Sequence, residues 1–147
     1  MRKILTLAAI AIMGIAVFSG CSKKSSSPSY GMKATIGSTA YNAPYCLASS
    51  TSGVLVIDGL GGSATAPTPP YVTIVIPSWT SAAGTFNLDS TMTANYAEYI
   101  LSDTVARISK TGSVIITSVT STSIAGTFSF SCTDGTAVSS GSFTAKR

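Results

Sequence analysis

The stretch GSVIITSVTSTSIAGTFSFSCTDGTAVSSGSFTAK, residues 112–146, decides the fold. In its middle part, a mainly apolar set of residues alternates strictly with hydroxyl-bearing or small ones. The mainly apolar set is Ile124, Gly126, Phe128, Phe130 and Cys132. A period of two is typical of a strand with one buried face, whereas a helix would scatter these residues around its axis. Asp134-Gly135 is a strong signal for a hairpin turn. The stretch therefore predicts three consecutive antiparallel strands.

The preceding part of the chain continues the same pattern. Further strands are expected at 32–36, 41–48, 53–60, 71–76, 94–101 and 104–109, with a short one ending at Leu88. Pro44 cannot donate to a ladder, which predicts an edge or bulged strand there. The glycine- and proline-rich stretch 59–70 predicts a long irregular loop. The expected fold class is all-β, an antiparallel β-sandwich or flattened barrel of about eight or nine strands.

The first 20 residues predict a cleaved lipoprotein signal peptide. A basic start, Arg2-Lys3, precedes a mainly apolar run that is shorter than the ~20 residues a membrane span needs. The ending Phe18-Ser19-Gly20-Cys21 resembles a bacterial lipobox, although leucine is preferred where Phe18 stands. Cys21 is therefore expected to carry lipid, palmitate included. The alternative is an ordinary secreted protein whose Cys21 forms a disulfide.

The predicted organisation after the signal is a lipidated cysteine with a polar tether, 21–30, and one all-β domain, 31–147. Ser22 in place of aspartate resembles lipoproteins that pass to the outer membrane. Lys23-Lys24 are basic where surface-exported lipoproteins are acidic, so the periplasmic side is expected.

The charge of the domain excludes one class of partner. The whole chain has a formal charge of +4, but four of its nine basic residues precede the domain. From Tyr30 onward the five bases are Lys33, Arg107, Lys110, Lys146 and Arg147, and the five acids are Asp58, Asp89, Glu98, Asp103 and Asp134. Five minus five is zero, and a neutral domain lacks the basic stripe that nucleic acid binding requires.

Cysteine usage predicts a disulfide. If Cys21 carries lipid, Cys46 and Cys132 remain as an even pair in an oxidising compartment. A bridge across this long loop would stabilise the domain by up to ~4–5 kcal/mol in the chain-entropy account. The alternative is two separately buried thiols.

The C-terminal third resembles small Bacteroidetes lipoproteins classed only as a domain of unknown function. Their ends follow a G-x-V-x-I-T…I-x-G-T-F-S-F…G-x-F pattern, which here begins at Gly112 and ends at Phe143. The resemblance implies an all-β fold and a lipid anchor, and it brings no activity and no catalytic residue. Cys46 and Cys132 stand where these relatives more often have other residues, which fits the bridge.

The residue inventory argues against an enzyme. The chain has no histidine, which removes Ser-His-Asp and Cys-His nucleophiles and histidine-based zinc sites. No metal and no cofactor are expected. Asp58 and Asp134 each precede a glycine and are interpreted as turn residues. Glu98, between two tyrosines, is the least expected acid, and it is interpreted as paired with Arg107 or Lys110 on a solvated face.

Aromatic residues are the better lead to a binding site. The candidate ligand-facing residues are Tyr45, Tyr71, Trp79, Tyr96, Glu98 and Tyr99. Such residues can form a platform for a sugar ring or an apolar ligand, and the alternative is core and cross-strand packing.

The leading hypothesis is a non-enzymatic, lipid-anchored β-domain of the cell envelope with a binding or structural role, whose partner is a glycan or an apolar small molecule. The second hypothesis is a calycin-like carrier, in which the strands enclose an apolar ligand. The third is a glycan-active enzyme, which requires two carboxylates facing one cleft.

Overall fold

The computed structural model describes residues 29–63 and 65–147 and shows them as an all-β domain of ten strands. The strands are β1 (Gly31–Ile36), β2 (Thr39–Ala43), β3 (Tyr45–Thr51), β4 (Val54–Gly62), β5 (Pro67–Ile76), β6 (Gly84–Leu88), β7 (Tyr96–Ser102), β8 (Val105–Val119), β9 (Ser123–Cys132) and β10 (Ala137–Lys146). Within these ranges, no helix has the length and apolar character needed to cross a membrane. The predicted signal peptide, the lipid site at Cys21 and most of the tether lie outside the described residues.

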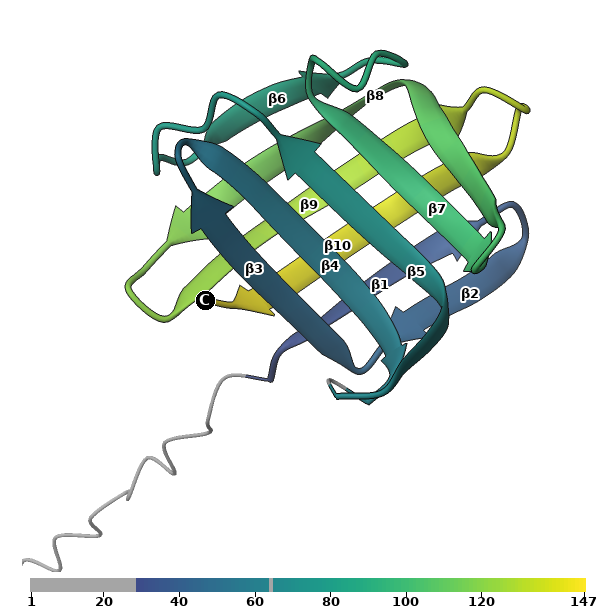
Figure 1. Cartoon of the computed structure of the whole chain (residues 1–147), viewed down its shortest axis with the longest axis horizontal. Helices are drawn as coiled ribbons and strands as arrows, with labels where there is room; N and C mark the ends of the chain where they lie inside the picture. Colours follow the sequence, from purple (N-terminus) through teal and green to yellow (C-terminus); the bar gives the residue numbers. More distant parts are fainter. Residues whose placement is uncertain (1–28, 64) are drawn as a thin grey trace, which may run out of the picture.

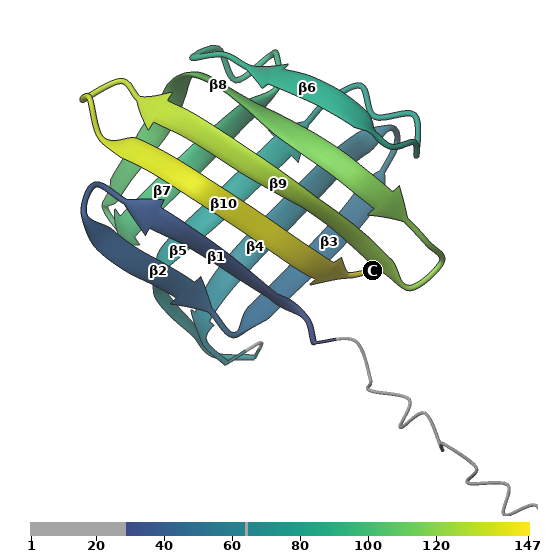
Figure 2. The same cartoon turned by 180° about the vertical axis from the view of Figure 1, so that it is seen from behind.

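The strands form a flattened barrel with two layers. Strands β3, β4, β5 and β7 make the front layer in Figure 1, and β2, β1, β10, β9, β8 and β6 make the back layer, which faces the viewer in Figure 2. Seven strands close into a ring, and β1, β2 and β6 extend it. The predicted fold class is therefore confirmed.

Two features close the ring. The 15-residue strand β8 belongs to both layers, because its first residues pair with β7 and its later residues pair with β9 and β6. On the opposite side, β10 meets β3 through one parallel pair, Lys146 with Leu47. This second junction is a seam, since every other pair of ring neighbours shares an antiparallel ladder.

The predicted apolar face of β9 is buried, and it explains the glycines of the C-terminal pattern. Each of three glycines lies directly across from a phenylalanine on the next strand, in the pairs Gly112–Phe130, Gly126–Phe143 and Gly141–Phe128. A Cβ added at Gly126 would lie 2.7 Å from Cζ of Phe143, and one at Gly141 would lie 2.6 Å from Cδ2 of Phe128. The rings therefore occupy the space that glycine leaves free.

Strand boundaries differ from expectation around two prolines. The predicted strand 41–48 is two strands in different layers, with Pro44 between β2 and β3. The predicted loop 59–70 is wrong, because β4 continues to Gly62 and β5 begins at Pro67. Asp58 consequently lies in β4, and its interpretation as a turn residue is wrong.

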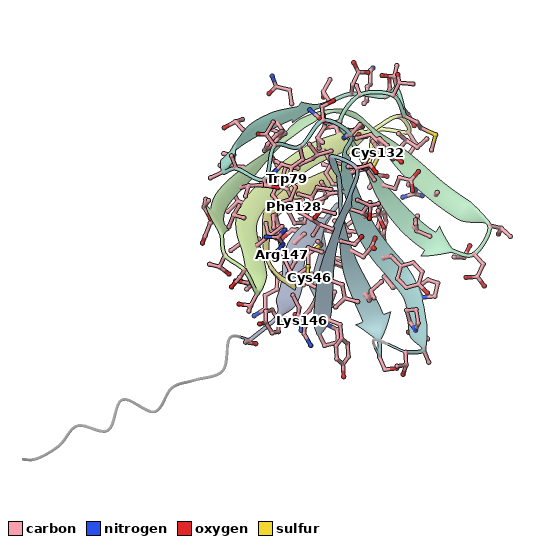
Figure 3. All side chains as sticks on the ribbon, turned by 60° about the vertical axis from the view of Figure 1, so that its left-hand side comes forward. Cys46, Trp79, Phe128, Cys132, Lys146 and Arg147 are labelled. Carbon is pink, nitrogen blue, oxygen red and sulfur yellow. The ribbon has the colours of Figure 1, made fainter. Side chains whose placement is uncertain are left out.

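The predicted disulfide is not formed, and both Cys46 and Cys132 are buried free thiols. Cys46 lies by the seam, next to the pair of Lys146 with Leu47. Cys132 ends β9, whose last residues pair with the start of the ten-residue β10. The two cysteines are thus about one strand length apart, ~30 Å, far beyond the ~7 Å that a bridge allows. Figure 3 labels them in well separated places.

The buried side chain of Tyr41 bonds to the backbone at the place where the register between β4 and β5 shifts. Its hydroxyl donates to the carbonyl oxygen of Gly59 at 2.7 Å and accepts from the amide of Val72 at 3.2 Å. The ladder between β4 and β5 is irregular between Gly59 and Gly61, so this side chain supplies bonds at a place where the backbone register shifts. Burial raises the pKa of Tyr41 and keeps its hydroxyl protonated.

Tyr41→Phe is expected to lower the free energy of unfolding by ~1–3 kcal/mol, because two buried backbone groups lose their partner. Urea unfolding of the variant and of Tyr45→Phe, an exposed tyrosine of the next strand, checks this. Equal stability of the two variants would contradict the role given to the Tyr41 hydroxyl.

Candidate functional site

The outward face of the front layer carries an unusual mixture of apolar, aromatic and acidic side chains, and we call it the outer face. Alternation along each strand turns Leu55, Ile74 and Ala97 inward, where they are fully buried, and turns their neighbours outward. The outward residues are Tyr45, Leu47, Val56, Asp58, Leu60, Tyr71, Thr73, Val75, Tyr96, Glu98 and Ile100. Most of them are half-buried, so the face is only partly wetted.

Three polar side chains cross the middle of the outer face in one line, which we call the acceptor row. Asp58 of β4 pairs with Thr73 of β5, and Thr73 pairs with Glu98 of β7. The hydroxyl of Thr73 donates to Oδ1 of Asp58 at 2.8 Å. Because neighbouring strands lie ~4.8 Å apart, the backbones of Asp58 and Glu98 are ~10 Å apart.

All three side chains of the acceptor row are half-buried, and Asp58 lies in poorly solvated surroundings. Burial raises the pKa of Asp58, and the hydrogen bond from Thr73 acts in the opposite direction. Burial also raises the pKa of Tyr96, and the negative charge of Glu98 adds to this shift. Tyr96 therefore lies within electrostatic reach of Glu98, from which it is separated by one residue on the same strand face.

A hollow of about 380 Å³ opens where the acceptor row reaches the seam, and it is lined by Leu47, Ala48, Ser49, Asp58, Lys146 and Arg147. Arg147 is held in place: its guanidinium lies 5.6 Å from the ring centre of Trp79 and donates to the carbonyl of Thr120 at 3.0 Å. The hollow thus combines an acceptor on β4 with two cationic donors at the end of β10.

The structure brings together four of the six candidate ligand-facing residues. Tyr45, Tyr71, Tyr96 and Glu98 lie on the outer face. Trp79 is 4% exposed and belongs to the core, and Tyr99 packs against the core because it follows Glu98 and points the other way. These two aromatic side chains are therefore separated from the other four by the sheet itself.

The expected ion pair of Glu98 with Arg107 or Lys110 is absent from the described residues. Arg107 instead pairs with Asp134 across 2.7 Å, and its guanidinium also donates to Thr136. Asp134 lies in the β9–β10 turn as predicted, and hydrogen bonds from Thr136, followed by the charge of Arg107, lower its pKa. Glu98 pairs in register with Ile108, and among the described residues it forms no ion pair with Lys110 either.

Cys46 lies beneath the seam and adds no reactivity to the site. Burial, followed by the negative charge of Asp58, raises the pKa of Cys46 to about 12. The nucleophilic form of cysteine is the thiolate, and at neutral pH this thiol stays protonated.

The sequence interpretation missed Asp58 and Thr73. Asp58 follows the continuous apolar run 54–57 and precedes a glycine, which favoured a turn, whereas Thr73 lies inside a predicted strand and drew no attention as a polar residue. Among the described residues, no group of three or more His, Cys, Asp or Glu side chains could hold a metal ion.

Asp58→Asn is expected to change how stability depends on pH. The folded state binds the Asp58 proton more tightly than the unfolded state, so the wild-type free energy of unfolding falls as pH rises from about 3.8 through the raised pKa. Asparagine keeps the acceptor for Thr73 and removes this fall, so the variant should be the more stable protein at neutral pH and gain nothing at low pH.

Urea midpoints of the wild type and of Asp58→Asn between about pH 3 and pH 7 measure the effect. Asp103→Asn, in the exposed β7–β8 turn, is the control. A pH slope in Asp58→Asn equal to that of the wild type would show that burial of Asp58 does not affect folding.

A family model described as "Domain of unknown function (DUF6252)" matches residues 29–145. No curated protein and no solved structure matches the chain. The match spans most of the chain, from the start of the described residues to the end of β10, and the chain belongs to this family. This match confirms the predicted resemblance to a domain of unknown function.

Proposed function

We propose that this member of the family is a lipid-anchored, non-enzymatic binding module of the cell envelope, and that its outer face is the binding surface. One observation carries the proposal: the acceptor row lies half-buried on an otherwise apolar sheet face that no other part of the described chain covers. The largest apolar patch on a typical monomer measures about 300–600 Å² and is often functional.

The anchor is inferred from the sequence and places the domain at a membrane. The lipobox-like ending at Cys21 favours lipid attachment, Ser22 favours the outer membrane, and the basic Lys23-Lys24 favour its periplasmic side. Labelling of cells with a palmitate analogue should mark the wild type and leave Cys21→Ala unmarked, and equal labelling would contradict the anchor. Removal of the domain by protease on intact cells would contradict the periplasmic side.

The binding surface is tested by carboxyl-group footprinting. A carbodiimide labels exposed Asp and Glu side chains, and mass spectrometry reads each site. With a detergent extract of the cell envelope, labelling of Asp58 and Glu98 should fall, while labelling of the loop residues Asp89 and Asp103 stays constant. Uniform labelling of all four residues with and without extract would contradict a binding role for the outer face.

The carrier is the second candidate, and the closed ring of strands is compatible with it. Its interior is filled by side chains, and those that are fully buried include Met32, Leu55, Ile57, Ile74, Ile76, Ile116 and Ile124. A bound apolar molecule would have to displace some of these side chains. Mild purification followed by native mass spectrometry would reveal a retained ligand and would favour the carrier over the outer-face module.

A further inference from the structure

We propose that the outer face binds a neutral oligosaccharide laid across the strands along the acceptor row; this rests on the binding function proposed above and names its ligand class. Four features of the outer face support this ligand class: its size, its shape, its hydrogen-bonding groups and its two flanking tyrosines.

The size of the outer face does not suit a stable protein partner or a second copy of the chain. Four strands and about five residues along each give roughly 300 Å². A standard protein interface buries ~800 Å² on each partner. Two copies packed face to face would also bring Asp58 and Glu98 against their own equivalents, and like charges in apolar surroundings repel.

The shape of the face does not suit a compact apolar ligand. Sites for such ligands are concave and enclose most of the molecule. The outer face is the solvent side of a sheet, and its two hollows, of about 380 Å³ beside Asp58 and about 280 Å³ between Tyr45 and Lys146, both lie at the seam. Neither hollow is lined by a residue of β5 or β7, so most of the face is open. A ligand that lies flat across β3, β4, β5 and β7 fits this surface.

The hydrogen-bonding groups of the row demand a ligand that donates. Thr73 uses its hydrogen on Asp58, so its remaining capacity is to accept, and the carboxylates of Asp58 and Glu98 only accept. Sugar hydroxyls donate to such groups. At the seam, Lys146 and Arg147 supply donors for ring and hydroxyl oxygens. The two carboxylates disfavour an anion, and the two cations at the rim disfavour a polycation.

Two tyrosines flank the row on opposite sides. Tyr71 precedes Thr73 by two residues on β5, and Tyr96 precedes Glu98 by two residues on the antiparallel β7. Aromatic rings offer a rigid apolar surface with a polar tip, which suits the C–H faces and hydroxyl edges of a sugar. The row spans ~10 Å between its carboxylate-bearing backbones, a length that two linked rings cover and a single ring does not.

The test is a nuclear magnetic resonance titration of the isotope-labelled chain from Ser22 onward, which contains all described residues. The probes are cellotetraose, maltotetraose and chitotetraose, with tetralysine and decanoate as the cationic and apolar alternatives. At least one tetrasaccharide should shift resonances of β4, β5 and β7 with a Kd of about 1 mM or tighter. Tyr71→Ala and Glu98→Ala should each weaken this binding about tenfold or more. The spectrum of each variant shows whether it is folded.

Matched controls lie on the hydroxyl-bearing face of the back layer. Thr127→Ala and Ser129→Ala, both exposed on β9, should bind the sugar as the wild type does. Shifts from tetralysine or decanoate alone would overturn the sugar assignment and leave the proposed binding function standing. Sugar shifts confined to β9 and β10, or none with any tetrasaccharide, would also overturn the assignment. The footprinting with envelope extract decides the binding function separately.

Discussion

Phe128→Ala is expected to lower the free energy of unfolding by about 3–5 kcal/mol, the typical cost of emptying a phenylalanine site in a packed core. Phe128 is 4% exposed. Its ring lies 6.2 Å from that of Phe130 and 6.3 Å from that of Phe143, centre to centre. It also covers Gly141, so alanine would leave a void above a residue with no side chain to fill it.

Urea unfolding followed by tryptophan fluorescence measures this effect, since Trp79 is buried in the same core. The control is Phe86→Ala on the edge strand β6, where the ring is half-buried and packs against one side of the core only. We expect a cost of about 1 kcal/mol there, in proportion to the smaller area buried. If the two variants were equally stable, the three phenylalanines would not form the centre of the core.

The C-terminal strands could be predicted because their sequence keeps a strict alternation of buried and exposed residue types. From Ile124 to Cys132 every second residue is apolar or glycine, and the structure buries each of them. The sequence alone does not explain why Gly126 and Gly141 are glycines. The pairs Gly126–Phe143 and Gly141–Phe128 show that they are part of the packing, a relation that appears only once the register between β9 and β10 is known.

The stretch 59–70 could not be predicted in the same way. Glycine and proline are poor strand residues, and their local preference indicated a loop. The structure places Pro67 in a segment of β5 that pairs with β4 alone, because pairing with β7 begins at Tyr71. A proline that faces an unpaired edge loses no ladder bond.

For the candidate site, the strand face of each residue could be predicted, but the neighbouring strands could not. Alternation alone puts Tyr96 and Glu98 on one face of their strand and Tyr99 on the other. Which strands lie beside β7 depends on the fold. Because β6 lies in the back layer, β5 pairs directly with β7. This pairing aligns Asp58 and Thr73 with Glu98. The disulfide prediction was wrong for a related reason, since counting cysteines says nothing about their positions.

Gly126→Ala is expected to destabilise the domain by about 3 kcal/mol or more, although it adds only one carbon atom. The new Cβ would clash with the carbonyl oxygen of Ile115 on β8 and lie 2.7 Å from Cζ of Phe143 on β10. Both neighbours belong to paired strands, so neither moves without disturbing a ladder. Gly84→Ala is the matched control, because its Cβ would meet Phe86 at an ordinary 3.7 Å in the edge strand β6. Alanine reduces the conformational entropy of the unfolded chain about equally at both positions, so the difference between their urea midpoints isolates the clash. A Gly126→Ala protein as stable as Gly84→Ala would mean that the β8–β9–β10 layer adjusts freely, and the close Gly–Phe pairs would then not be what fixes its register.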